Sequence, residues 1–253
     1  MPRFFVQASA ISEDTVILTG DNAHHAAYSL RLAPGDRIQV CDQQTAYLCE
    51  MVSFDSDSAT ARILSAAPID TEPPFVARLY QALPKGDKLD TVIQKAVECG
   101  ACEVIPFESS RCIVRAKPEA EARKTERRCR IAEEAAKQCG RGMIPTVRPT
   151  VSYSEALALI VKADLALFCY EGKEVTSLPL LIEQARPRLD AILAEGRLPE
   201  IAIVIGSEGG FSPEEAAAAR DAGCAMTGLG KRILRTETAS GFVLSCLSYA
   251  LEL

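Results

Sequence analysis

Length, composition and charge limit the class of protein first. The chain has 253 residues, of which 48% are hydrophobic and 25% are charged. This composition suits a folded protein of one or two domains and excludes an intrinsically disordered chain. No apolar run approaches the roughly 20 residues of a membrane span, and the amino-terminal segment lacks the apolar core of a secretory signal, so we expect a cytoplasmic protein. The net charge of −6 by itself argues against a nucleic-acid partner.

The ten cysteines are scattered and indicate reduced thiols rather than a disulfide framework. The only close pair is Cys99 and Cys102, and no second pair stands at metal-ligand spacing. His24 and His25 are the only histidines. We therefore predict no metal site, and we interpret the cysteine pair as small apolar side chains at a helix end.

The charge is unevenly distributed along the chain. Residues 1–72 carry a net charge of −6, residues 73–150 carry +5, and residues 151–253 carry −5. The basic excess is densest between Arg111 and Arg130. Such a run is typical either of a phosphate-binding surface or of a solvated helix face, and the sequence leaves both open.

The first seventy residues have the pattern of a small β domain. We predict short strands over residues 37–41, 46–52 and 58–64. Turn signals at 34–36 and 55–57 separate them, and the prolines of segment 70–74 indicate a linker. Closely spaced short strands of this kind favour a small β-barrel over residues 1–72.

The remaining residues, 73–253, alternate between strand and helix patterns and predict an α/β domain with a parallel sheet. The expected strands are 76–83, 103–107, 164–170 and 200–206, and the expected helices are 87–100, 118–139 and about 237–251. Another helix should begin after Ser212, which has the features of an N-cap residue followed by proline and two glutamates.

Two glycine-containing segments are candidates for ligand binding. Apolar strand 200–206 runs directly into the sequence Gly206, Ser207, Glu208, Gly209, Gly210. Glycines at the carboxyl end of a strand let backbone N–H groups approach a ligand, although a tight turn without a ligand has the same pattern. The spacing matches neither a dinucleotide-binding fingerprint nor a P-loop.

The second segment, 228–238, combines two glycines with Lys231, Arg232 and Arg235 before the last helix. Thr236 or Thr238 would cap that helix, with Glu237 favourable in its first turn. Capping accounts for the threonines but not for the clustered basic residues. A third cluster, 135–142, places basic residues and a glycine break at a helix end, where the helix dipole is an alternative explanation.

Together these segments resemble the RsmE family, the 16S rRNA uridine N3-methyltransferases of the SPOUT superfamily. The resemblance covers almost the whole chain and is most specific in Gly206 to Phe211 and Leu229 to Thr238. The other matching segments are Arg3 to Phe5, His25 to Asp36, Lys85 to Lys88, Gln94 to Gly100, Ile105 to Arg111 and Gln138 to Pro145. Ser207 stands where the family commonly has proline, and Val97 and Cys99 replace its usual threonine and leucine.

The resemblance implies a PUA-like RNA-binding β-barrel over 1–72, followed by a SPOUT methyltransferase domain over 73–253 with a carboxyl-terminal trefoil knot. It also implies a homodimer and S-adenosylmethionine as cofactor, bound in the knot mainly by the backbone of three loops. The implied cofactor-binding residues are Cys169, Tyr170, Glu171, Gly172, Gly206, Ser207, Glu208, Gly209, Gly210, Phe211, Leu229, Gly230, Lys231, Arg232, Ile233, Leu234 and Thr238.

The implied substrate is one uridine of 16S rRNA in the small ribosomal subunit, position 1498 in the family. Methylation at N3 requires the base to be unpaired and its N3 proton to be lost, which leaves negative charge on the neighbouring carbonyl oxygens. A guanidinium stabilises such charge. We assign this role to Arg235, with Arg141 and Arg111 as further candidates, and we consider Glu237 as an orienting group or proton acceptor.

The residues expected to bind RNA are Arg3, His25, Arg31, Lys85, Lys88, Arg111 and Gln138. If the β domain binds RNA, Arg3 and Arg31 should lie on one face with the carboxylates turned away. Two other hypotheses remain: a non-catalytic RNA-binding protein that keeps the fold, and an acidic metabolic enzyme that binds a small nucleotide. The first leaves two intact cofactor loops unexplained, and the second leaves the basic middle region unexplained.

Overall fold

The structure is a computed structural model that describes residues 1–172 and 174–253. The chain divides into two compact units. The first unit consists of Met1–Glu72 and Ala136–Ile144, and the second consists of Pro73–Ala135 and Pro145–Leu253. Segment 136–144 lies within the predicted methyltransferase domain, 73–253, in sequence but belongs to the first unit, where Arg141 and Gly142 are hydrogen-bonded to Glu72.

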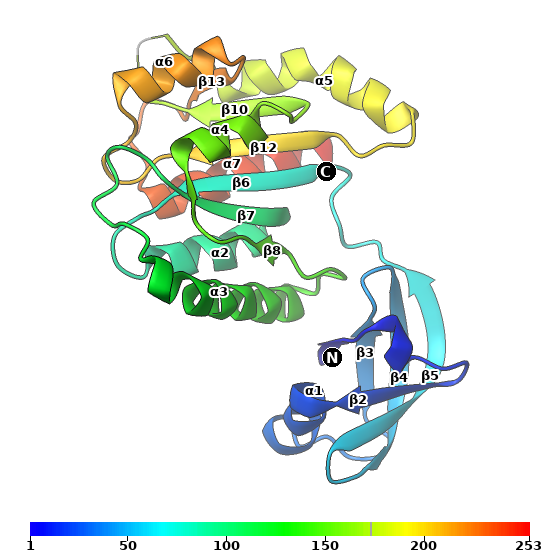
Figure 1. Ribbon diagram of the computed structural model, residues 1–253. Helices are drawn as coiled ribbons and strands as arrows, with labels where there is room; N and C mark the ends of the chain where they lie inside the picture. Colours follow the sequence, from blue (N-terminus) through cyan, green and yellow to red (C-terminus); the bar gives the residue numbers. More distant parts are fainter. Residues whose placement is uncertain (173) are drawn as a thin grey trace. The chain divides into compact units, whose positions relative to one another are not determined.

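The first unit is a five-stranded sheet with a short helical segment (Figure 1). Its elements are β1 (Arg3–Phe5), the 3₁₀ turn η1 (Ala8–Ala10), β2 (Thr15–Thr19), α1 (Gly20–His24), the π-helical turn η2 (His25–Ser29), β3 (Arg37–Cys41), β4 (Thr45–Phe54) and β5 (Ser58–Pro68). The strand order is β1-β3-β4-β5-β2. Alternate residues such as Val16 and Leu18 of β2 enter a core around Phe4 and Ile38.

The three strands predicted in this unit are confirmed, with β4 and β5 longer than expected. The predicted small β-barrel is found in part: the five strands form a half-barrel sheet, whose edge strands are β1 and β2. Ala23 of α1 and Ala26 of η2 are buried in the same core. The helical segment therefore contributes to the core that the half-barrel sheet encloses.

The second unit contains a mainly parallel sheet in the order β11-β13-β10-β12-β6-β7-β8, with β9 paired to β7. Its strands are β6 (Val76–Ala82), β7 (Ala101–Glu108), β8 (Thr146–Val147), β9 (Val151–Ser152), β10 (Leu165–Cys169), β11 (Thr176–Ser177), β12 (Glu200–Ile205) and β13 (Ala225–Gly228). Five residues of β12, Ile201–Ile205, are buried. Both faces of this strand are covered, as a continuous apolar run in a parallel sheet predicts.

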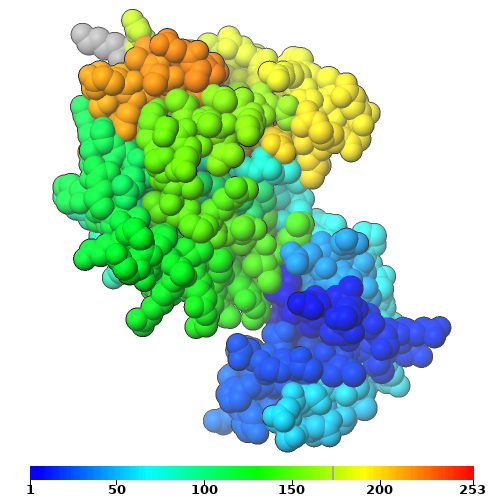
Figure 2. Space-filling model, viewed as in Figure 1, coloured from blue at the N-terminus to red at the C-terminus, as the bar shows by residue number. Residues whose placement is uncertain are grey.

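The helices of the second unit cover both faces of the sheet (Figure 1). They are α2 (Lys88–Glu98), α3 (Pro118–Cys139), α4 (Tyr153–Ile160), α5 (Leu178–Ala194), α6 (Pro213–Asp221) and α7 (Thr236–Leu251). Helix α7 packs on β12, β6 and α2, whereas α4 packs on β7 and β9. In the space-filling view, light-green atoms of the segment around α4 lie in front of the middle of the sheet (Figure 2).

The predicted helices of this unit are confirmed to within two residues at each end, and α3 has the predicted bounds. Ser212 caps α6 in a capping box with Glu215, as its sequence indicates. Helices α4 and α5 and strand β13 were not predicted from the sequence. Across the part of the chain that the structure describes, no helix has both the length and the apolarity that crossing a membrane requires.

Replacing Ile203 with alanine tests how far the second unit depends on its central strands. Ile203 is fully buried in β12 between β10 and β6. We expect Ile203→Ala to lower the free energy of unfolding by about 2–5 kcal/mol in urea denaturation. The control is Leu198→Ala, which truncates a side chain that is 47% exposed just before the same strand and should change stability by less than about 0.5 kcal/mol. Equal effects of the two substitutions would contradict the expectation.

Candidate functional site

The three predicted cofactor loops leave the same edge of the second unit's sheet. Strands β13, β10 and β12 are adjacent and parallel. Their carboxyl ends are followed by segments 229–235, 170–172 and 206–212, respectively. Ligands of open α/β sheets bind outside the carboxyl ends of the strands. The structure therefore brings together three segments that are far apart in the sequence.

The carbonyl of Gly206 is the point where three elements of this edge meet. Gln81, fully buried in β6, donates from Nε2 to this carbonyl at 3.3 Å and to Thr236 Oγ1 at 2.8 Å. Thr236 Oγ1 in turn donates to the Gly206 carbonyl at 2.7 Å. These bonds join β6, the loop after β12 and the first turn of α7. Sequence reasoning did not identify Gln81, because a glutamine within an apolar strand has no motif around it.

The expectation that Thr236 or Thr238 caps α7 is wrong. Arg235 occupies the N-cap position, and no side chain makes a capping hydrogen bond there. The Thr236 hydroxyl is engaged with Gln81 and Gly206 instead. Glu237 lies in the first turn, as predicted.

The loop that follows β12 rests on a cluster of aromatic rings. Phe211 is 3% exposed. Its ring centroid lies 4.3 Å from that of Phe168 in β10, 6.3 Å from that of Phe107 in β7 and 6.5 Å from that of Tyr153 in α4. Burial, with the charge of Glu215 adding to it, raises the pKa of the Tyr153 hydroxyl. Phe211 therefore anchors the loop in the core rather than presenting its ring to a ligand.

Glu215 connects the loop after β12 with the loop after β7. Its carboxylate accepts hydrogen bonds from the backbone N–H of Ser110 at 2.6 Å, the hydroxyl of Ser110 at 2.9 Å and the backbone N–H of Ser212 at 2.9 Å. The side chain is buried, and its own carbonyl accepts from the Tyr153 hydroxyl at 2.6 Å. The two loops therefore hold a common position. The sequence identified Glu215 only as part of a helix start.

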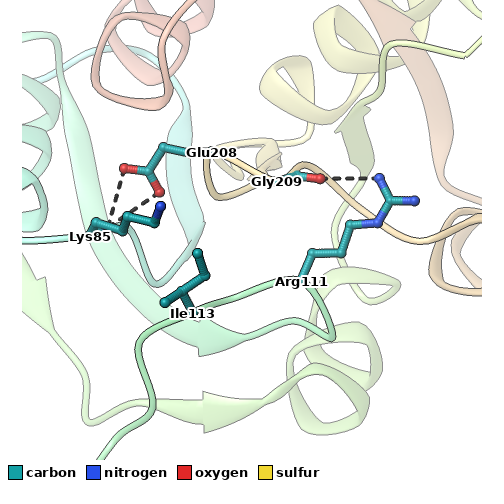
Figure 3. A pocket seen from close by; sticks show the side chains of 5 residues that line it. All are labelled: Lys85, Arg111, Ile113, Glu208 and Gly209. Carbon is teal, nitrogen blue, oxygen red and sulfur yellow. Dashed lines mark hydrogen bonds between the residues drawn. The ribbon is translucent and has the colours of Figure 1, made fainter.

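A hollow of about 170 Å³ opens between these loops, lined by Lys85, Arg111, Ile113, Glu208 and Gly209 (Figure 3). Lys85 follows β6, Arg111 and Ile113 follow β7, and the other two residues follow β12. The Arg111 side chain donates from Nη1 to the carbonyl of Gly209 at 3.1 Å. Two predicted RNA-binding residues, Lys85 and Arg111, therefore lie beside two predicted cofactor-binding residues.

Charged groups of opposite sign alternate next to the hollow. The Glu208 carboxylate accepts from Lys88 Nζ at 2.7 Å and from the backbone N–H of Lys85 at 3.2 Å. Partial burial by itself would raise the pKa of Glu208, but these hydrogen bonds and the Lys88 charge outweigh burial and lower it. The hydrogen bond to Glu208 raises the pKa of Lys88, and the nearby positive charge of Arg235 opposes that rise.

Glu237 and Arg235 belong to the same group of charges. Glu237 Oε2 lies 3.8 Å from Lys88 Nζ and is buried without a hydrogen-bond partner. Arg235 is exposed and precedes α7 directly. Its guanidinium therefore borders solvent while remaining within electrostatic reach of Lys88. The structure brings both predicted catalytic residues of this segment to the edge where the cofactor loops meet.

The other predicted cofactor residues differ in exposure. Lys231, Arg232 and Ile233 are exposed, and Ile233 is exposed to 82%. Cys169 ends β10, and burial raises the pKa of its thiol to about 12. The backbone N–H of Tyr170 donates to the carbonyl of Thr227 at 2.9 Å, which continues the pairing of β10 with β13 past the end of the strand.

Arg141, the third predicted catalytic residue, belongs to the first unit. Its guanidinium is buried and donates from Nε to Glu72 Oε2 at 3.0 Å. The Glu72 carboxylate also accepts from the backbone N–H of Gly142 at 3.1 Å. The observed contacts of Arg141 hold segment 136–144 in the first unit, and its catalytic role stays a prediction.

The RNA-binding candidates of the first unit have different surroundings. Arg3 donates to the carbonyl of Gly140 and to Gln39 Oε1, so it too holds segment 136–144. The His25 ring packs edge-on to Phe4. Arg31 and Gln138 are exposed, and Arg31 has a left-handed backbone with φ of 53°. The expectation that Arg3 and Arg31 share one face stays a prediction.

Many cations of the basic run are already engaged. Three arginines of α3 form ion pairs: Arg127 with Asp90, Arg128 with Glu121 and Arg130 with Glu126. Arg115, before this helix, donates to the carbonyls of Ser109 and Ser110. Much of the run therefore stabilises the helix and the loop before it.

Comparison with known protein families agrees with this geometry. The family model described as an RNA methyltransferase domain matches residues 71–248, and the one described as an RNA methyltransferase PUA domain matches residues 18–64. Ribosomal RNA small subunit methyltransferase E of Bacillus subtilis is 32% identical over 261 residues, covering 100% of this chain and 98% of the relative. This chain belongs to the RsmE family.

Further relatives extend the family likeness to solved structures. The methyltransferase E of Synechocystis is 32% identical over 252 residues, covering 99% of this chain and 78% of the relative. A crystal structure of the Neisseria gonorrhoeae methyltransferase E bound to S-adenosyl methionine matches with a TM-score of 0.83 and 29% identity over 98% of this chain and 97% of that one. A putative methyltransferase from Legionella pneumophila, also in complex with this cofactor, matches with a TM-score of 0.82 and 26% identity over the same shares.

Thr236→Val tests the hydrogen bonds at Gly206. Valine keeps the shape of threonine but removes the hydroxyl, which leaves buried polar groups of Gln81 and Gly206 without this partner. We expect a loss of about 1–3 kcal/mol in the free energy of unfolding, measured in urea. The matched control is Thr238→Val on the exposed side of the same helix turn, with an expected change below about 0.5 kcal/mol. A neutral Thr236→Val would contradict this role.

The lowered pKa of Glu208 predicts a pH-dependent contribution to stability. The ionised Glu208 carboxylate contributes fully to the free energy of unfolding above its unfolded-state pKa near 4.5. This contribution is lost as the pH falls through the lower folded-state pKa. The difference in unfolding free energy between the wild type and Glu208→Gln should therefore shrink between about pH 7 and about pH 3 in urea denaturation. In a Lys88→Met background this shrinkage should be smaller. A difference that is independent of pH would contradict the prediction.

Proposed function

We propose that this chain transfers the methyl group of S-adenosylmethionine to N3 of a uridine in 16S rRNA of the small ribosomal subunit, in the cytoplasm. The observation that supports this proposal most strongly is the shared edge: the loops after β10, β12 and β13 leave the same edge of the sheet, and the loop after β12 lines a hollow together with Lys85 and Arg111. Position 1498 is the target that the family resemblance implies. The family match and the cofactor-bound structures of relatives support the same activity.

The residues at this edge fit the cofactor. A side chain on Gly206 would place its Cβ 3.1 Å from the Cα of Gly210, and one on Gly209 would place its Cβ 3.1 Å from Arg111. Both positions of this loop therefore require glycine, and a backbone without side chains can approach a ligand closely. The Ser207 hydroxyl is buried there without a hydrogen-bond partner. We propose that loops 169–172, 206–211 and 229–234, with Thr238, hold the cofactor.

When bound, S-adenosylmethionine supplies a methyl group on a positively charged sulfur. The protein must present an unpaired uridine with N3 deprotonated. We assign Arg235 to the resulting negative charge on the carbonyl oxygens, because its guanidinium is exposed at the edge and five donor N–H groups are available to oxygen acceptors. Arg111, 3.1 Å from the Gly209 carbonyl, is the second candidate.

We assign Glu237 to positioning the guanidinium of Arg235. The alternative role of Glu237 is to accept the proton from N3 of the uridine. Its Oε2 has no hydrogen-bond partner and lies 3.8 Å from Lys88 Nζ. A carboxylate with a free acceptor can hold a neighbouring guanidinium in place or take a proton. Arg141 is assigned to the structure of the first unit, because its guanidinium is buried against Glu72.

We further propose that the carboxyl-terminal chain forms the trefoil knot of the SPOUT superfamily. The sheet order supports this proposal: β13 pairs outside β10, and the next helix, α7, returns to pack on β12, β6 and α2. A homodimer is proposed as well. The exposed side chains of Phe242 and Tyr249 on α7 suit burial at such an interface, which sedimentation analysis would detect.

The proposed activity is tested by incubating the protein with radiolabelled S-adenosylmethionine and small ribosomal subunits from cells that lack this modification. Methyl transfer to 16S rRNA, mapped to one uridine, is the expected result. Cofactor binding in calorimetry without transfer would favour a non-catalytic RNA-binding protein instead. If the protein neither binds S-adenosylmethionine nor transfers its methyl group, the proposal is wrong.

Arg235→Ala should reduce kcat by at least about 100-fold, because removing one preorganised charge-stabilising donor costs this much in comparable sites. Arg235→Lys should recover part of the activity. The matched control is Arg188→Ala on α5. Arg188 forms an ion pair with Asp164 at the opposite edge of the sheet, so this variant should keep wild-type turnover. Near-wild-type kcat in Arg235→Ala, measured with the same subunits, would remove Arg235 from the mechanism.

A further inference from the structure

Ile113 is an apolar side chain held out in solvent at the mouth of the site. It is 72% exposed, whereas its neighbour Cys112 is only 5% exposed. Ile113 is one of the five residues that line the hollow beside Arg111 and Gly209 (Figure 3). Removing an exposed aliphatic side chain from water is favourable. A binding partner that covers Ile113 therefore gains this hydrophobic free energy.

The exposure of Ile113 is imposed by the loop rather than by a lack of structure. Ser110 donates its backbone N–H and its hydroxyl to the buried Glu215 carboxylate. Cys112 Sγ lies 3.2 Å from Ser109 Oγ, and Arg115 donates to the carbonyls of Ser109 and Ser110. Residues on both sides of Ile113 are therefore anchored, and the side chain is presented in a preorganised position.

The charged residues around Ile113 indicate the chemistry of the ligand that covers it. Lys85 and Arg111 bring positive charge to the hollow, and both are exposed. The negative charge of Glu208 is offset by its hydrogen bond to Lys88. A ligand that fits has an apolar, flat face and a negatively charged backbone, which is the chemistry of a single-stranded nucleotide.

We propose that Ile113 is a positioning residue that packs against the face of an unpaired pyrimidine base of the RNA while Arg111 and Lys85 contact its phosphates. Apolar side chains that hold or displace bases are used by proteins that act on extruded nucleotides. The inference rests on the proposed function, since it takes the RNA to be the substrate, and it names how the base is oriented at the edge that carries Arg235.

The test measures binding of a short single-stranded oligouridine to the full chain by fluorescence anisotropy at several salt concentrations. Ile113→Ala should weaken binding by about tenfold, which corresponds to losing most of one buried aliphatic contact. The slope of log affinity against log salt should stay unchanged, because no phosphate contact is lost. Arg111→Ala should instead lower the magnitude of that slope by about one. An unchanged affinity of Ile113→Ala, or a changed slope, would overturn the inference.

Two control variants separate a base contact from a general effect on the protein. Ile113→Leu keeps an apolar side chain of equal size and should restore most of the affinity. Leu198→Ala removes a comparable exposed side chain before β12, at the opposite edge of the same sheet, and should bind like the wild type. An abasic ribose-phosphate chain should bind the wild type and Ile113→Ala equally. A tenfold difference on the abasic chain would show that Ile113 does not contact the base.

Methyl-transfer assays on the same variants distinguish this inference from the proposed function. Ile113→Ala should raise KM for the RNA by about tenfold with S-adenosylmethionine affinity unchanged. If the wild type binds oligouridine but transfers no methyl group, the proposed function fails and the effect of Ile113→Ala on binding still decides the inference. If the wild type binds no RNA, both fail.

Discussion

The carbonyl of Gly206 is the atom on which the arrangement of the site depends. It accepts hydrogen bonds from Gln81 in β6 and from Thr236 in α7, although these residues are 125 and 30 positions away in the sequence. The loop after β12 therefore cannot shift independently of the sheet or of the final helix. Because Arg235 and Glu237 flank Thr236, the same contact also sets where the charged groups of α7 begin.

Glu215 extends this fixed region to the loop after β7. A buried carboxylate that accepts from Ser110 and Ser212 makes the positions of Arg111, Ile113 and Gly209 mutually dependent. Buried polar groups rigidify a structure when their hydrogen bonds are satisfied. The site therefore consists of loops, yet these loops behave as parts of a rigid scaffold, which suits the alignment of a methyl donor with a nucleotide.

Local charge explains the site better than the net charge of −6 does. Several of the basic residues between Arg111 and Arg130 form ion pairs or bind backbone carbonyls. Lys85, Lys88, Arg111 and Arg235 come from three separate loops and a helix start, and only folding gathers them at one edge. An RNA phosphate responds to this local field, because charges further away than about 10 Å are largely screened in salt.

Features that depend on neighbouring residues could be predicted from the amino-acid sequence. The apolar run of β12, the Ser212 capping box, the bounds of α3 and the glycine-containing loops follow from local hydrogen bonding and burial. The family resemblance rests on the same short motifs. Four features became visible only in the folded chain: the half-barrel form of the first unit, the burial of Arg141 against Glu72, the junction of Gln81 with Thr236 across 155 residues, and the exposure of Ile113. These features arise from contacts between distant segments, and no pattern of adjacent residues encodes which distant partner satisfies a buried polar group.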